Sequence, residues 1–195
     1  LPMTLIDRKI DNYECNVIGL KNHEAAQQLT RHLAGNGFKS LLFLSEPIAS
    51  VNTRRERLEA FRQTVAEYPD ICGENAEIRL NQPEKLGECL REFLRRHSPE
   101  HCAIIAANGS MTLEVVKALR AEGLECGKDI GLAGFDEMSW SALAGPGITT
   151  LKQPTHQIGY SALQSVISMI KQNDTAPADQ FFSGELVVRG SSHPL

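Results

Sequence analysis

Residues 130–154 read IGLAGFDEMSWSALAGPGITTLKQP, and this stretch decides the fold. An apolar run over 130–135 ends on two acids, Asp136 and Glu137, and a second β-type run over 148–151 ends on a lysine and a glutamine. Open α/β sheets bind their ligands outside the carboxyl ends of buried parallel strands. The stretch therefore indicates one half of a small-molecule cleft.

The alternation of strand and helix continues outward in both directions. Strands separated by helices of about 10–15 residues indicate βαβ units and a parallel sheet covered on both faces. We therefore predict an α/β fold with doubly wound parallel sheets. Residues 53–56 (TRRE) resemble a capping box that would open the second helix. We expect strands at 1–6, 17–20, 39–44, 76–80, 101–107, 130–135, 148–151, 181–182 and 185–189, helices at 22–34, 53–67, 83–96, 110–121 and 155–171, and a polar turn at 173–179.

The bulk composition is that of an ordinary soluble globular chain. Its 195 residues are 42% hydrophobic and 23% charged, with no apolar run as long as the roughly 18 residues of a membrane span. A net charge of −4 argues against nucleic-acid binding by this segment. The five cysteines are widely spaced, which suits a reducing cytoplasm, and no cysteine or histidine spacing is typical of zinc ligands. We expect neither a cofactor nor a bound metal.

Five polar side chains stand where predicted strands give way to loops or helices. Because the carboxyl ends of parallel strands share one edge, these side chains are expected to converge. Two acids, a guanidinium and two amides suit a polyol, a sugar acid or a nucleobase. An acid or asparagine after a strand can also simply cap the next helix, and this alternative stays open for three of them. The five are Asp7, Arg57, Asn108, Asp136 and Gln153.

Three arginines crowd the first turn of the second predicted helix. Arg54, Arg55 and Arg57 all oppose the helix dipole there. A local conflict of this kind tends to mark a functional site, and Arg57 is the best candidate. The alternative is a solvated face on which Glu56 and Glu59 are the partners.

The only tryptophan, Trp140, lies in the loop beyond Asp136. An aromatic face there can stack on a sugar ring or base, although the side chain can equally anchor its own loop. The chain contains no G-x-S-x-G, Walker A or G-x-G-x-x-G motif, and no recognisable set of nucleophile, base and orienting group. We therefore do not expect an enzyme.

Six short motifs follow one another along nearly the whole chain. They are LIDR at 5–8, RERLEAF at 55–61, AAN at 106–108, GFDE at 134–137, TTLKQP at 149–154 and ELVVRGSS at 185–192. In this order they resemble the effector-binding core of the lactose-repressor (LacI/GalR) family of bacterial transcription regulators. The ligand domain of that family is similar in architecture to periplasmic sugar-binding proteins.

The resemblance implies a ligand site between two lobes, lined by the five polar residues named above. It makes Trp140 and the residues near Asn81 and Gln82 possible walls of that site. It also implies three chain crossings, near 19–22, 148–153 and 183–185. Residues 21–148 and 184–195 would then form a complete C-terminal lobe, and residues 1–20 and 149–183 a partial N-terminal lobe.

The resemblance further implies a cytoplasmic homodimer that binds operator DNA, in which a small metabolite controls DNA binding. The DNA-binding domain is absent from these 195 residues, so we expect an upstream portion in the intact protein, or another chain, to cover the partial lobe. Two positions depart from the family pattern: Gly109 replaces an acid, and Ala60 replaces a glycine. The glycine puts the local helix cap in doubt more than the ligand contact.

The arginines together with Lys152 favour a sugar acid of the gluconate or ketogluconate type, with a neutral sugar as the near alternative. A periplasmic sugar-binding protein of a transport system is the rival function. A third reading is a flavodoxin-like enzyme that uses Asp136 as a general base.

Overall fold

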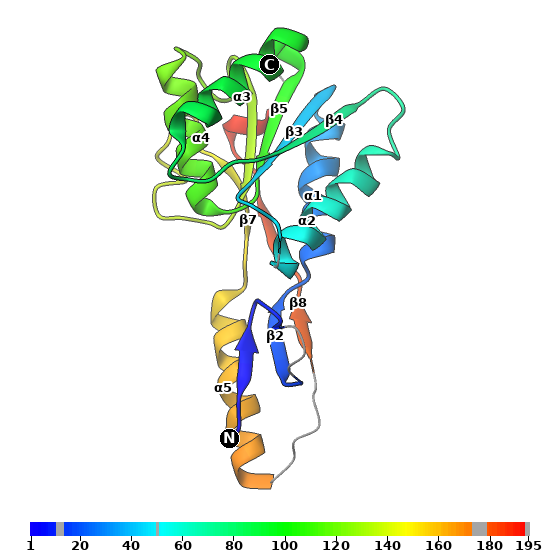
Figure 1. Cartoon of the computed structure of the whole chain (residues 1–195), viewed down its shortest axis with the longest axis vertical. Coiled ribbons are helices and arrows are strands. Elements are labelled where there is room, and N and C mark those ends of the chain that lie inside the picture. The colour runs from blue at the N-terminus through cyan, green and yellow to red at the C-terminus, as the bar shows by residue number, and fades with distance from the viewer. Residues whose placement is uncertain (11–13, 50, 173–178, 194–195) are drawn as a thin grey trace.

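The computed structural model describes residues 1–10, 14–49, 51–172 and 179–193, which form two separate sheets (Figure 1). The larger sheet, with its helices, fills the upper part of the view, and the smaller sheet lies below it beside one long helix. The chain passes between the sheets three times, after β2, after β7 and after β8, whose bounds are given below. Two of these crossings touch, because the amide of Lys21 donates to the carbonyl of Phe182 at 2.8 Å.

The large sheet has six strands in the order β4-β3-β5-β6-β7-β9. Every neighbouring pair is parallel except the last, in which β9 runs antiparallel to β7. This arrangement confirms the predicted α/β fold. The strands are β3 (Ser40–Ser45), β4 (Cys72–Glu77), β5 (Cys102–Ala106), β6 (Gly131–Phe135), β7 (Thr149–Lys152) and β9 (Glu185–Val187).

Two helices cover each face of this sheet. Leu41 and Phe43 of β3 pack in one core cluster, which includes side chains of α1 (Asn22–Gly35) and α2 (Asn52–Val65). Leu42 and Leu44 pack in the opposite cluster with α3 (Pro83–Arg96) and α4 (Gly109–Ala121). Successive side chains of a strand point to opposite faces, so a strand buried on both faces reads as a continuous apolar run.

The small sheet contains three parallel strands, β1 (Thr4–Ile6), β2 (Asn16–Leu20) and β8 (Gln180–Phe182), in the order β1-β2-β8. The long helix α5 (Thr155–Gln172) packs against it through Ile158 and Ala162. No helix in the described part of the chain combines the length and the hydrophobicity needed to cross a membrane.

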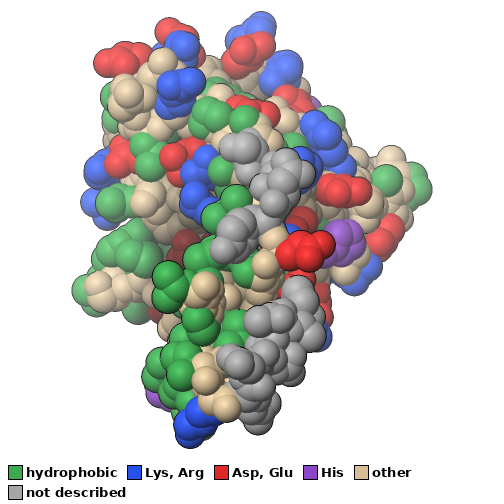
Figure 2. All heavy atoms as spheres, turned by 60° about the horizontal axis from the view of Figure 1, so that its bottom comes forward, with side chains coloured by type: hydrophobic (Ala, Val, Ile, Leu, Met, Phe, Trp, Pro, Cys, Tyr) green, Lys and Arg blue, Asp and Glu red, His purple; other side chains and the backbone are tan. Residues whose placement is uncertain are grey.

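The small sheet and α5 leave large apolar side chains exposed. Figure 2 shows apolar side chains gathered on the part of the surface that this end of the molecule forms. Contiguous apolar surface of this kind marks a place where another segment or chain binds. The exposed members are Leu1, Ile6, Ile10, Tyr160, Leu163, Ile170 and Phe181.

Some predicted boundaries are wrong. Residues 149–152 are predicted to belong to the partial lobe, but they form β7. This strand pairs with β6 in the large sheet, where Thr149, Thr150 and Leu151 are fully buried. The expected strand at 76–80 begins earlier, at Cys72, where backbone pairing with β3 starts. Of the polar turn predicted at 173–179, residues 173–178 lie outside the described part of the chain.

The predicted capping box is also wrong. Helix α2 begins at Asn52, with Val51 as the N-cap residue and no capping side chain. Thr53 therefore lies inside the helix, where it is buried. The side chain of Asn52 instead donates to Glu56 at 3.1 Å, so Glu56 does not reach back to an N-cap amide.

Candidate functional site

Four of the five sequence-predicted polar residues lie just after strands, and the fifth, Arg57, lies in a helix. Asn108, Asp136 and Gln153 follow β5, β6 and β7, three adjacent strands of the large sheet. Arg57 lies in the second turn of α2, and Asp7 follows β1 of the small sheet. The sequence thus distributes one site over five elements, and the parallel topology brings the strand ends to one edge.

Arg57 is a buried cation with donors to spare. Its side chain is only 5% exposed, and its guanidinium lies 4.1 Å from the centre of the Phe135 ring. Nε donates to Oδ1 of Asn22 and Nη1 donates to the carbonyl of Ala107, each at 2.7 Å. A guanidinium has five N–H donors, so three of them have no partner among the described residues.

The electrostatics of Arg57 show which acids surround it. Burial lowers the pKa of the guanidinium, and the negative charges of Asp136 and Asp7 partly oppose this effect. A buried charge needs compensation by opposite charges and hydrogen bonds. Asp136 and Asp7, like Glu56, are therefore near enough to act on the charge of Arg57, although Asp136 and Asp7 lie far from it in the sequence.

Asp136 is held rigidly beside the first residue of α4. Its Oδ2 accepts from the amide of Gly109 at 3.0 Å, and its Oδ1 accepts from Nε2 of Gln153 at 2.6 Å. A carboxylate at a helix N-terminus is favoured by the helix dipole. The backbone of Asp136 adopts a positive φ of 73° while its amide bonds to the carbonyl of Leu151. Such a strained, fixed conformation is typical of functional positions.

A side chain at position 109 would have little room, although the backbone amide that makes this contact is present in any residue but proline. A Cβ atom there would lie 3.0 Å from Cγ of Met138 and 3.4 Å from Cβ of Asp136, closer than most side-chain contacts. An acid at this position would require the exposed Met138 side chain to shift by a few tenths of an ångström. The doubt about the helix cap is also resolved, because Asn108 supplies it.

Asn108 caps α4 through its Oδ1, which accepts from the amide of Met111 at 2.8 Å. Its Nδ2 donates to Oε2 of Glu46 at 3.1 Å. The structural alternative raised from the sequence is therefore realised for Asn108. One amide hydrogen has no partner in the described structure and could still contact a ligand.

Asp7 has an unsatisfied oxygen. Its Oδ1 is buried and has no hydrogen-bond partner among the described residues. Its φ is 69°, and its amide donates to the carbonyl of Ile18 at 2.9 Å, which fixes the turn after β1. Buried polar atoms without partners are rare in native proteins, so this oxygen is a candidate hydrogen-bond acceptor.

Sequence reasoning missed two members of this site. Asn22, at the start of α1, is buried and orients Arg57, and Glu46 follows β3 directly. The side chain of Glu46 accepts from Nη2 of Arg54 at 2.7 Å as well as from Asn108. The rule that identified Asp136, an acid directly after a buried strand, would also have found Glu46.

The three arginines of α2 have different environments. Arg54 pairs with Glu46 and with the carbonyl of Pro47, Arg55 is exposed, and Arg57 is buried. Arg57 has the environment expected of a ligand-binding residue.

Trp140 is partly buried and packs against the core cluster on the α3 and α4 face of the sheet. This packing anchors the loop after β6. Its predicted role as a wall of the ligand site stays a prediction.

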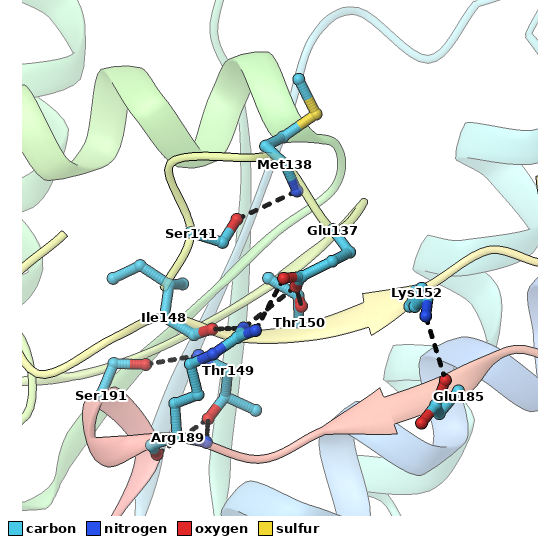
Figure 3. Close-up of polar contacts among 10 residues, drawn as sticks. All are labelled: Glu137, Met138, Ser141, Ile148, Thr149, Thr150, Lys152, Glu185, Arg189 and Ser191. Carbon is cyan, nitrogen blue, oxygen red and sulfur yellow. Dashed lines mark hydrogen bonds and ion pairs between the residues drawn. The ribbon is translucent and has the colours of Figure 1, made fainter. Parts of the chain in front are cut away.

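Glu137, the residue after Asp136, belongs to a cluster of hydrogen bonds centred on Arg189 (Figure 3). Nη2 and Nη1 of Arg189 donate to the two carboxylate oxygens of Glu137 at 2.6 and 3.0 Å. Nη1 of Arg189 also donates to the carbonyl of Ile148 at 2.8 Å, and the hydroxyl of Thr150 donates to Glu137. The cluster joins the loop after β6 to β7 and to the segment after β9, so it fixes the frame on which Asp136 is held.

Glu137→Gln is expected to lower the free energy of unfolding at neutral pH by about 1–3 kcal/mol, because charge-assisted hydrogen bonds are lost. The Arg189 guanidinium lowers the pKa of the Glu137 carboxyl below its ordinary 4.5. A depressed folded-state pKa stabilises the protein above the ordinary value and loses that effect as pH falls through the lower one. Urea unfolding of both proteins should therefore give a difference that shrinks below pH 4.5.

Glu185→Gln is the matched control for this experiment. Its carboxylate lies 3.6 Å from Nζ of Lys152 and its side chain is 71% exposed, so its loss should change stability little. Equal effects of the two substitutions, or a Glu137→Gln effect that does not change with pH, would contradict the assigned role of the Glu137–Arg189 pair.

A hollow of about 490 Å³ lies at the far end of α4 from Asn108 and Gly109. Its lining includes Val116, Arg120, Cys126 and Pro146, and none of the predicted site residues. It is separate from the polar residues around Arg57.

Comparison with known proteins decides which family this architecture represents. The model of the periplasmic binding protein-like domain matches residues 30–192. The chain belongs to this family. The transcriptional regulator PtxS of Pseudomonas aeruginosa, an HTH-type protein, is 34% identical over 195 residues, which are 100% of this chain and 56% of PtxS. The HTH-type regulator KdgR of Bacillus subtilis is 31% identical over 98% of this chain and 57% of its own length.

The solved structures agree with this periplasmic binding protein-like assignment. A LacI family regulator from Enterococcus faecium, solved with bound ribose, superposes with a TM-score of 0.84 at 15% identity, over 100% of this chain and 71% of that protein. The comparisons confirm the predicted fold and the predicted resemblance to LacI-type regulators. The chain spans about half the length of the curated relatives it matches.

Proposed function

We propose that this periplasmic binding protein-like chain binds the effector of a LacI-type transcription regulator, a small hydrophilic metabolite held by Arg57, Asp136 and Asp7. The observation that carries the proposal is the buried Arg57, with three N–H donors unused in the described structure, beside the unpartnered buried oxygen of Asp7. Donors and acceptors without protein partners at one place suit a ligand rich in both.

A sugar acid fits this set of groups best. The free edge of the Arg57 guanidinium can hold a carboxylate through two parallel hydrogen bonds. The carboxylate oxygens of Asp136 and Asp7 can accept from sugar hydroxyls, and the remaining amide hydrogens of Asn108 and Gln153 can donate to them. A neutral sugar is the second candidate, favoured by the ribose bound to the Enterococcus faecium neighbour.

The mechanism proposed is a population shift between open and closed arrangements of the two lobes. Asp7 belongs to the small sheet, whereas Arg57 and Asp136 belong to the large lobe. A ligand that touches both sides binds the closed arrangement more tightly, and only this difference in affinity can shift the equilibrium. The cluster around Arg189 supplies a rigid frame for one of the two sides.

We further propose that the intact protein is a cytoplasmic homodimer in which this shift repositions DNA-binding segments upstream of residue 1. The HTH-type names of PtxS and KdgR support this proposal, and they favour a regulator over a transport protein. The exposed apolar side chains of α5 and the small sheet support it too, because further segments of a longer protein would cover them. We do not propose catalysis.

A thermal-shift screen tests the proposed effector class. The intact regulator would be heated with gluconate and ketogluconate, with neutral sugars such as ribose, and with purines. A ligand that binds only the folded state raises the unfolding midpoint. We expect a rise with sugar acids and a smaller one with neutral sugars. A rise with purines alone would contradict the proposal.

A further inference from the structure

A second cluster of polar side chains lies at the opposite, amino edge of the large sheet. Cys72 is the first residue of β4 and Glu74 is two residues further on, so both side chains point to the same face. This is the face covered by α3, because Ala76 of the same strand packs in the α3 and α4 cluster. His97 follows the last residue of α3.

These three side chains present three different ligand atoms to one point. The Cys72 sulfur, a Glu74 carboxylate oxygen and a His97 ring nitrogen all lie within 4.8 Å of one another. Nε2 of His97 and Oε1 of Glu74 are 2.7 Å apart. The ring centre of His97 lies 4.9 Å from that of Phe93, which is fully buried and so holds the imidazole in place.

We propose that Cys72, Glu74 and His97 bind a divalent transition-metal cation, with Zn²⁺ as the expected ion. Thiolate, imidazole and carboxylate are the ligands that Zn²⁺ takes in proteins, whereas Mg²⁺ and Ca²⁺ prefer oxygen alone. Zinc–ligand bonds of about 2.0–2.3 Å in tetrahedral geometry place the ligand atoms roughly 3.3–3.8 Å apart. The His97–Glu74 pair has to open by less than about 1 Å, and the Cys72 sulfur has to close in.

The charges at this place suit such an ion. The Cys72 thiol releases its proton on binding, so a thiolate and the Glu74 carboxylate face the two positive charges of Zn²⁺, and Arg96 adds one positive charge beside the carboxylate. The second oxygen of Glu74 already accepts from Nη2 of Arg96 at 2.6 Å, which orients the carboxylate as second-shell groups do in metal sites. Cys72 is exposed, so an ion could reach the cluster from solvent.

The bound ion would join two parts of the fold. Strand β4 is an edge strand and pairs only with β3 in the large sheet. A cation held by Cys72, Glu74 and His97 would connect this edge to the end of α3. The sequence alone predicted no metal, because the ligands come from two elements and have none of the usual zinc spacings.

Titration of the protein with Co²⁺, which occupies zinc sites, tests the proposal directly. We expect a thiolate-to-cobalt charge-transfer band that saturates at one equivalent and disappears when Zn²⁺ is added. Cys72→Ser and His97→Ala each remove a direct ligand, so each should weaken Zn²⁺ binding by more than the roughly 10- to 100-fold that loss of an outer-shell partner costs. Cys89→Ser is the control, because Cys89 is a partly buried thiol of α3 outside the cluster, and it should leave the titration unchanged.

Far-ultraviolet circular dichroism of each variant shows whether the fold is retained. Absence of the cobalt band in the folded wild-type protein would overturn the proposal. A band that persists at full strength in folded Cys72→Ser would overturn it as well, because another thiol would then be the ligand.

Discussion

Arg57→Ala will lower the affinity for the effector by roughly 100-fold, since hydrogen bonds to a charged group contribute about 1.5–3 kcal/mol each. The guanidinium is buried. In the Arg57→Ala variant, a bound ligand would leave no room for water to take over the hydrogen bonds that the guanidinium donates. The measurement is a calorimetric titration of the intact regulator with the compound that gives the largest thermal shift. Arg55→Ala is the matched control, because Arg55 is exposed on the same helix and its removal changes the net charge equally.

The loss of Arg57 will also destabilise the fold, because Asn22 and the carbonyl of Ala107 lose their partner. Arg57→Lys separates the two effects. A lysine keeps the charge but cannot form two parallel hydrogen bonds to a carboxylate, so the affinity should still fall clearly while the fold is better preserved. If folded Arg57→Lys and Arg57→Ala both bind as tightly as the wild type, the assigned role is wrong.

Asp136→Asn will weaken effector binding by about 10- to 100-fold, because a charged acceptor becomes a neutral one. Asparagine tolerates a positive φ better than most residues, so the backbone at 73° should be retained. The single amide oxygen of asparagine cannot accept hydrogen bonds from both Gly109 and Gln153 as the two carboxylate oxygens do. We therefore also expect the free energy of unfolding to fall by about 1 kcal/mol.

Asp70→Asn is the control for this second substitution. The side chain of Asp70 is 65% exposed and pairs with Lys39 just before β4, at the opposite edge of the large sheet. The Asp70→Asn substitution removes one negative charge, as Asp136→Asn does, but lies outside the candidate site. Titration calorimetry should find that the Asp70→Asn variant binds the effector as tightly as the wild type. An equal loss of affinity in the Asp70→Asn and Asp136→Asn variants would mean that net charge, and not contact with Asp136, controls binding.

The sequence predicted the buried strands of the large sheet well, because a strand covered on both faces is apolar throughout. Leu41, Phe43 and Ile104 belong to such runs, and the strands that contain them were expected within a residue or two. The strand ends then placed Asn108, Asp136 and Gln153 at one edge without any knowledge of distances. Strand β4 is different: its exposed edge carries polar residues, and the start at Cys72 could not be read from hydrophobicity.

Side-chain contacts between residues far apart in the sequence could not be predicted from sequence patterns. Nothing near Asn22 in the sequence indicates that it orients Arg57, which lies 35 positions away. The sequence offered a helix cap as one of two roles for Asn108, and only the hydrogen bond to Met111 decides for it; the unpartnered oxygen of Asp7 could not be predicted at all. The metal-ligand set of Cys72, Glu74 and His97 arises only when β4 lies beside the end of α3.

A crystal structure of the intact protein with the proposed effector tests the central claim most directly. The account predicts ligand atoms within hydrogen-bond distance of the Arg57 guanidinium and of the carboxylates of Asp136 and Asp7, with the two lobes closed around them. An effector bound elsewhere, for example in the hollow lined by Arg120, Cys126 and Pro146, with Arg57 and Asp7 untouched, would contradict it.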